Sequence, residues 1–258
     1  SSFCLIITEG TAPAHVGKAY PGIPGIYTDS QIAGWKKITE AVHASGGRIF
    51  MQLMHSGRIS HTKITGLNPI SASAVTPAGE LFTGTGMDPF ETPKEMSLQD
   101  IADVKASFVT AAKNAISAGF DGVELHGANG YLLHQFLAPN SNIRTDEYGG
   151  SIENRSRLLK EVMLAVCPEI GSARCGIRIS PVTPANDASD ASPQALFEHV
   201  ASFLGSLSLA YVHTIEGSTG AARDYQQGEN AFDYAALKSA YRQAGGQGAW
   251  MLNNGYEH

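Results

Sequence analysis

The segment Gly122–Tyr131 carries the densest group of side chains that could take part in a reaction. It reads Gly-Val-Glu-Leu-His-Gly-Ala-Asn-Gly-Tyr and begins with the alternation of a β-strand. That alternation places Glu124 and His126 on one face, opposite the apolar residues between them. Small residues follow, so the chain can turn at the end of the strand and bring polar side chains together there.

His126, Asn129 and Tyr131 form the pattern H-x-x-N-x-Y. The turn can bring His126 and Asn129 together as two hydrogen-bond donors to one oxygen atom. Two donors on a carbonyl oxygen stabilise the negative charge that develops when a nucleophile or hydride adds to the conjugated system. Tyr131, whose hydroxyl has an unperturbed pKa of about 10, could then protonate the adjacent carbon as a general acid. A lone histidine at a strand end is more often structural, but the three-residue pattern favours catalysis.

Two further polar side chains interrupt segments that otherwise read as buried strands. Arg178 lies in the alternating run 175–180, and its guanidinium needs an acceptor because it cannot lose its proton. The residues alone leave open whether that acceptor is Glu124, in an internal ion pair, or a ligand. Gln52, in the run 48–53, is either a satisfied buried amide or a reader of a ligand's own amide edge.

Several other chemistries lack the residues that they need. No lysine falls in any predicted strand, so a Schiff-base aldolase would have no nucleophile. Histidines and carboxylates do not cluster at the predicted strand ends, so we expect no metal site.

The elements that must position these residues alternate along the chain. Apolar runs predict six strands, near Cys4–Thr8, Arg48–Leu53, Gly122–His126, Gly176–Ser180, Ala210–Ile215 and Ala249–Asn253. Helical periodicity predicts five helices between them, at Ser30–Ser45, Ser97–Ala118, Ile152–Cys167, Pro193–Leu204 and Phe232–Gln243. Caps support two of the starts, at Thr28–Ser30 and at Ser97 with Asp100.

This order favours an α/β fold with a parallel sheet, either doubly wound or closed into a (β/α)8 TIM barrel. No glycine-rich nucleotide motif follows a predicted strand, so the barrel is preferred. A closed barrel has eight strands, whereas six are predicted. We therefore expect residues 1–258 to form a single barrel domain that contains the central six β/α units and lacks the first and last strands.

Composition excludes several classes of protein. The 18 basic and 24 acidic residues give a net charge of −6, which argues against a nucleic-acid or anionic-membrane partner. No apolar run reaches the length of a membrane span. The three cysteines form no C-x-x-C pair, and the first residues lack the basic region of a signal peptide. These features predict a reducing, cytoplasmic location.

The linked motifs resemble those of the Old Yellow Enzyme family of FMN-dependent ene-reductases, or NADH:flavin oxidoreductases. The resemblance extends along nearly the whole chain, in the family's order and spacing. It is carried by Thr8–Thr11, Gln31–Trp35, Gln52–His61, His126–Pro139, Asn142–Arg155 and Gly176–Pro181.

The resemblance implies that FMN lies across the mouth of the barrel. Gln52 would then hold the pyrimidine edge of the flavin, and Arg178 would sit near N1 and O2, where reduced flavin carries negative charge. Gly10 would bring the backbone close to the flavin. Asn254 and Gly255 match the loop after the family's seventh strand, where main-chain N–H groups help to bind phosphate.

The resemblance also implies a reaction. NADH or NADPH would reduce the flavin, and an electron-poor alkene, an α,β-unsaturated carbonyl or nitro compound, would then replace it. His126 and Asn129 would bind the carbonyl or nitro oxygen, N5 would deliver hydride to the β-carbon, and Tyr131 would protonate the α-carbon. Tyr20 falls where the family has a pocket-lining tyrosine. Met54 stands where many members have tryptophan, which should widen and soften the pocket.

A second interpretation comes from a different class. A chain without the family's first and last strands could be a non-catalytic barrel remnant, an interaction scaffold that no longer holds FMN. Cofactor binding distinguishes the two.

Overall fold

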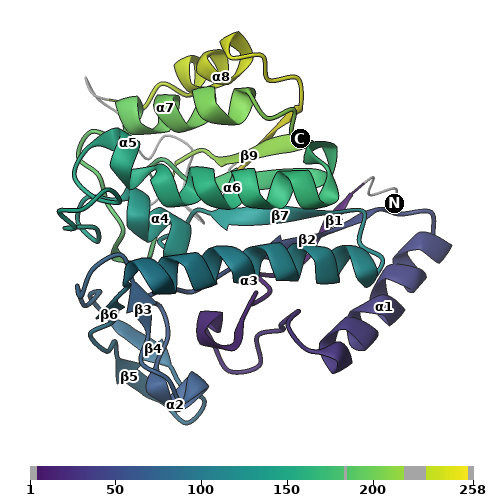
Figure 1. Ribbon diagram of the computed structural model, residues 1–258, viewed down its shortest axis with the longest axis horizontal. Coiled ribbons are helices and arrows are strands. Elements are labelled where there is room, and N and C mark those ends of the chain that lie inside the picture. The colour runs from purple at the N-terminus through teal and green to yellow at the C-terminus, as the bar shows by residue number, and fades with distance from the viewer. Residues whose placement is uncertain (1–4, 183–184, 218–230, 255–258) are drawn as a thin grey trace.

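The computed structural model describes residues 5–182, 185–217 and 231–254, and a curled parallel sheet lies at its centre (Figure 1). Six strands form this sheet, and each pairs in parallel with the next one along the sheet. In sheet order they are β1 (Ile6–Ile7), β2 (Ile49–Leu53), β7 (Gly122–Gly127), β8 (Cys175–Ile179), β9 (Tyr211–Ile215) and β10 (Ala249–Asn253). The prediction of six parallel strands is therefore confirmed, and Cys4 lies outside the described residues.

The register of the central strands sets polar residues in two neighbouring rows. In one row Gln52 of β2 is opposite Glu124 of β7. In the next row His126 of β7 is opposite Arg178 of β8, which is opposite His213 of β9. Side chains of one strand alternate between the two faces, so these residues share the face that the helices do not cover.

Helices cover the other face of the sheet. Figure 1 shows α3 (Leu98–Ser117), α6 (Arg157–Ile170) and α7 (Pro193–Gly205) side by side over the strands, with α8 (Tyr234–Gln243) next to α7. Their apolar stripes pack against the outward residues of the strands and form the main hydrophobic core.

Two of the described helices begin with a capping box. Thr28 and Gln31 form a capping box at α1 (Asp29–Ala44), and Ser97 and Asp100 form another at α3. Both starts agree with the caps predicted from sequence.

The helix predicted over residues 152–167 is two helices. α5 (Ile152–Arg155) ends before Ser156, and α6 begins after it and runs to Ile170. The break follows Arg155, whose buried guanidinium donates hydrogen bonds to the Leu137 carbonyl and to Asp190. The prediction of one continuous helix over residues 152–167 is therefore wrong, because the tertiary contacts of Arg155 compete with the helical periodicity.

Short elements between β2 and α3, and after β7, were not predicted. They comprise α2 (Thr62–Thr65), β3 (Ile70–Ser71) paired with β6 (Lys94–Glu95), the hairpin of β4 (Glu80–Phe82) and β5 (Met87–Pro89), and α4 (Leu132–Leu137). The described elements also include three short 3-10 helices. They are η1 (His15–Gly17), η2 (Ser172–Arg174) and η3 (Ala185–Asp187). Each is too short to show a period in the sequence. Within the described ranges, no helix is both long and apolar enough to cross a membrane.

Two leucines of α6 provide a matched test of the helix-to-sheet packing. Leu159 is fully buried and lies against Gly127 at the end of β7, whereas Leu164 is 53% exposed. We expect Leu159→Ala to lower the free energy of unfolding by about 2–5 kcal/mol through the cavity it leaves. Leu164→Ala should change it by less than about 0.5 kcal/mol. Urea denaturation measures both, and equal losses would contradict this packing.

Candidate functional site

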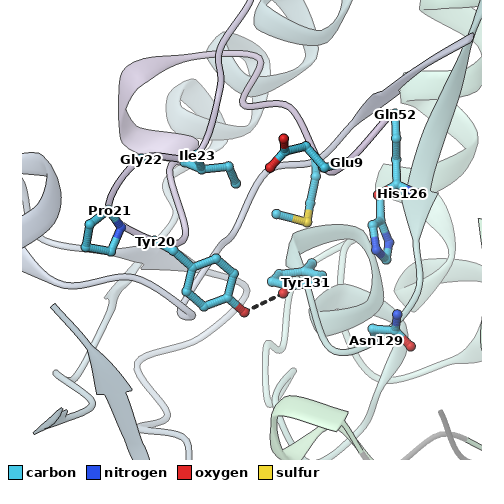
Figure 2. A pocket seen from close by; sticks show the side chains of 11 residues that line it. Glu9, Tyr20, Pro21, Gly22, Ile23, Gln52, His126, Asn129 and Tyr131 are labelled. Atoms are coloured by element: carbon cyan, nitrogen blue, oxygen red, sulfur yellow. Dashed lines mark hydrogen bonds between the residues drawn. The ribbon is translucent and has the colours of Figure 1, made fainter. Parts of the chain in front are cut away.

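A cavity of about 430 Å³ opens where β1, β2 and β7 end, and it gathers most of the predicted site residues. Seven of them line it: Gly10, Tyr20, Gln52, Met54, His126, Asn129 and Tyr131. Figure 2 shows Gln52, His126 and Asn129 along one side of the cavity, with Tyr131 and Tyr20 across from them. Four lining residues were not predicted, namely Glu9, Pro21, Gly22 and Ile23. All four lie in connections without a periodic pattern that could have indicated them.

His126 is a neutral donor in this structure. Its side chain is buried at the end of β7, and Nδ1 lies 3.2 Å from the backbone nitrogen of Ala128. A backbone N–H can only donate, so Nδ1 accepts and the ring proton resides on Nε2. Burial, with the positive charge of Arg178 as a smaller cause, lowers the pKa of His126 to about 3. The ring can therefore donate one hydrogen bond from Nε2 without carrying a charge.

Asn129 is held by a turn with left-handed backbone. Its φ is 53°, its N–H donates to Ser180 Oγ at 2.8 Å, and its carbonyl accepts from Asn186 Nδ2 at 2.7 Å. Gly130 follows with φ 71°, and a Cβ there would lie 2.4 Å from the carbonyl oxygen of Ala185. Asparagine and glycine are the residues that tolerate this conformation most readily. The turn therefore fixes where Asn129 lies relative to His126.

Tyr131 shares a short hydrogen bond with Tyr20. The two hydroxyl oxygens are 2.5 Å apart, and the Tyr131 side chain is buried whereas Tyr20 lies at the surface. Burial raises the pKa of Tyr131 well above its usual value, and the Tyr20 hydroxyl adds to this effect. Tyr131 is therefore less acidic in this structure than a free tyrosine, because its side chain is buried beside Tyr20.

Glu124 is the centre of a buried polar group. Its carboxylate is fully buried and accepts hydrogen bonds from Gln52 Nε2 at 2.7 Å and from His213 Nδ1 at 2.9 Å. His213 was not predicted, although its place between Val212 and Thr214 in an alternating strand is a usable signal.

Arg178 does not pair directly with Glu124 among the described residues. It donates instead to Asn253 Oδ1 at 2.8 Å, and its Nε is buried without a hydrogen-bond partner in the described part of the chain. Burial lowers the pKa of Arg178, and the Glu124 charge opposes that shift. The internal ion pair left open by the sequence is thus absent here, although Arg178 lies beside His126 in the sheet.

Gly10 and Met54 touch each other at the wall of the cavity. A Cβ on Gly10 would lie 2.6 Å from the Met54 sulfur, so the close approach that glycine permits here is to Met54. Asn254 is not among the residues that line the cavity. Asn254 follows β10 and donates to the Glu216 carbonyl at 2.9 Å, and Gly255 lies outside the described residues.

Gln135 ties the loops around the cavity together. Its Oε1 accepts from Arg58 N–H and Ser71 Oγ, at 3.0 and 2.9 Å. Its Nε2 donates to the carbonyls of Ser56 and Gly130, at 2.9 and 2.8 Å. A single buried amide thus joins the loop after β2 to the turn that carries Asn129. A glutamine in the fully buried, mostly apolar helix α4 is a signal in the sequence for such a role.

The state of His126 can be measured directly. Because burial keeps its pKa near 3, we expect nitrogen NMR to show a proton on Nε2 and none on Nδ1, with no titration between about pH 5 and 8. Below about pH 6.5 this histidine binds a proton in the unfolded chain but stays neutral in the folded chain. The free energy of unfolding therefore decreases as the pH falls toward 3. A doubly protonated ring at pH 6 would contradict this assignment.

Comparison with known proteins places the chain in a family. The profile of the NADH:flavin oxidoreductase / NADH oxidase family matches residues 1–248. Flavin oxidoreductase hxnT of Emericella nidulans is 45% identical over 217 residues, which are 82% of this chain. A probable flavin mononucleotide-dependent alkene reductase of Leishmania infantum is 43% identical over 84% of this chain. The chain spans 56% and 61% of the lengths of these two relatives.

A solved structure agrees with this match. The Old Yellow Enzyme homologue from Zymomonas mobilis superposes with a TM-score of 0.88 at 36% identity, covering 98% of this chain and 69% of that protein. The match of the family profile and the identity of these relatives confirm the resemblance seen in the motifs: the chain belongs to the NADH:flavin oxidoreductase / NADH oxidase family, that of Old Yellow Enzyme.

Proposed function

We propose that this chain is an FMN-dependent, NADH- or NADPH-using ene-reductase that reduces electron-poor alkenes, α,β-unsaturated carbonyl or nitro compounds. The observation that carries the proposal is the neutral, buried His126, whose Nε2–H donor shares one cavity with Asn129 and Tyr131. The names of the relatives from Emericella and Leishmania, a flavin oxidoreductase and an alkene reductase, support it. They favour this function over a non-catalytic scaffold.

The fold proposal follows the same relatives. We propose that the six β/α units belong to an eight-stranded (β/α)8 barrel and form one domain with the rest of residues 1–258. The support is the parallel order of the strands and the similarity to the Zymomonas structure.

The residues around the cavity fit a flavin. Arg178 has a buried Nε without a partner among the described residues, and an electron-rich ring edge would satisfy it. Gln52 lines the cavity, and its Oε1 makes no hydrogen bond to the described residues. Gln52 and Arg178 would therefore hold the ring, with Gly10 at its border. Asn254 and Gly255 remain proposed contacts of the phosphate group.

The chain's own residues would orient the substrate and move its proton. The two-electron chemistry, hydride acceptance from NADH or NADPH and hydride delivery to the β-carbon, would be supplied by bound FMN. His126 and Asn129 would donate hydrogen bonds to the carbonyl or nitro oxygen as negative charge develops there. Tyr131 would protonate the α-carbon, and its high pKa keeps that proton in place beforehand. Tyr20, 2.5 Å away, would then donate a hydrogen bond to the Tyr131 oxygen left behind.

Cofactor binding and reduction test the proposal. The purified full chain, incubated with FMN and desalted, should be yellow. NADPH or NADH should bleach the flavin absorption without oxygen, and an unsaturated ketone or nitroalkene should restore it. A protein that stays colourless after this treatment would defeat the proposed function and favour the scaffold.

Tyr131→Phe separates proton donation from flavin reduction. The change should slow alkene reduction by about 100-fold or more, because no group in its place can protonate the α-carbon. Reduction of the flavin by NADPH should be nearly unchanged, and stopped-flow absorbance measures the two half-reactions separately. Tyr148→Phe is the matched control, since Tyr148 is also buried but donates to Glu161 away from the cavity. Equal losses in both half-reactions of Tyr131→Phe would contradict the role of proton donor.

A further inference from the structure

We propose that Glu124 is a positioning residue that fixes the direction of the Gln52 amide, so that the Gln52 carbonyl oxygen faces the cavity as a hydrogen-bond acceptor. The ligand group that this acceptor would recognise is the N–H of a flat heterocyclic ring. Where the ligand is FMN, this inference rests on the proposed function. It adds to that function Glu124, a residue that does not line the cavity.

The strand register builds this contact. Gln52 and Glu124 are directly opposite each other on β2 and β7, with Gln52 Nε2 2.7 Å from Glu124 Oε1. The β8 residue opposite Glu124 is Gly176, which has no side chain to separate Glu124 from β9. His213 of β9 reaches across β8 and places Nδ1 2.9 Å from the second carboxylate oxygen, Oε2. Each oxygen of the carboxylate therefore has its own donor.

The charge of Glu124 decides which end of the Gln52 amide faces it. An ionised carboxylate can only accept hydrogen bonds, so the amide NH₂ must point toward it and the carbonyl oxygen must point elsewhere. Turning the amide over would set two acceptors against each other in a site where Glu124 is fully buried and Gln52 is 6% exposed. The second carboxylate oxygen faces His213 Nδ1 at 2.9 Å, so both oxygens of Glu124 already face nitrogen atoms.

Chemical complementarity then selects the ligand edge. The oxidised isoalloxazine ring of FMN carries a single N–H, at N3, between two carbonyl groups. An acceptor fixed at Gln52 Oε1 matches that N–H, whereas an amide free to turn over would match the carbonyl groups as well. By fixing the direction of the Gln52 amide, Glu124 would therefore make Gln52 selective for a ligand N–H over a ligand carbonyl group.

The direction of the amide can be measured without any ligand. In the wild-type chain with nitrogen-15 and carbon-13 labels, we expect NMR to show a coupling across the hydrogen bond from Gln52 Nε2 to the Glu124 carboxyl carbon. We also expect slow exchange of the Gln52 NH₂ hydrogens with solvent. A Gln52 NH₂ group that exchanges freely and shows no coupling would overturn the proposal, and this test needs no variant to fold.

Binding of two probes tests the consequence. The wild-type chain should bind FMN about tenfold or more tightly than N3-methylated FMN, because the methyl group removes the donor and leaves a buried acceptor unpaired. In Glu124→Gln the ratio should fall to about threefold or less, because an amide at that position can donate as well as accept and Gln52 can turn over. Glu161→Gln is the matched control. Glu161 also accepts two side-chain hydrogen bonds, from Lys105 and Tyr148, but lies away from the cavity, so its ratio should equal that of the wild type.

The outcomes separate this inference from the proposed function. A Glu124→Gln protein that binds FMN and keeps the full wild-type ratio would overturn the positioning role. An equal loss of affinity for both probes, with the ratio kept, would also overturn it, because that result indicates a structural role alone. A wild-type chain that shows the Gln52 coupling but binds neither probe would contradict the proposed function while supporting the direction of the amide.

Discussion

The parallel register of β2, β7, β8 and β9 decides which side chains reach the cavity. Neighbouring residues of a strand face opposite sides, so the pairing of Gln52 with Glu124 commits the whole of β7 to one orientation. A slip of one residue would turn Val123 and Leu125, both fully buried in the core, toward the cavity and the carboxylate toward the helices. The apolar packing of α3 and α6 on one face of the sheet therefore fixes the positions of the polar groups on the other face.

Features that depend on one stretch of chain were predictable from the sequence. The alternation in Gly122–Tyr131 was sufficient to place Glu124 and His126 on one face, because a period of two is a local property. Thr28 and Ser97 were sufficient to start two helices, because a cap needs only residues of the following turn.

Features that depend on several strands were not predictable. Alternation in its own strand could have placed His213 on the polar face, but its pairing with Glu124 follows from β9 lying two strands away from β7 in the sheet. The Asn253 contact of Arg178 spans β8 and β10 in the same way. The pKa of Tyr131 depends on how deeply Tyr20 and the loop around it cover the hydroxyl. Such effects arise from burial, which spacing along a chain does not report.

The two sides of the cavity differ in how tightly they are held. The four hydrogen bonds of Gln135 connect Ser56, Arg58, Ser71 and Gly130, so the wall that carries Asn129 has little freedom to move. The opposite wall is bounded by Met54, whose unbranched thioether is an adaptable side chain, and by Tyr20, which lies at the surface and is hydrogen-bonded to Tyr131. Steric selectivity should therefore be strict for the end of a ligand that contacts the rigid turn. It should be permissive for the opposite end of the ligand. Ligands of different size would be accommodated only on the side of the cavity that Met54 and Tyr20 form.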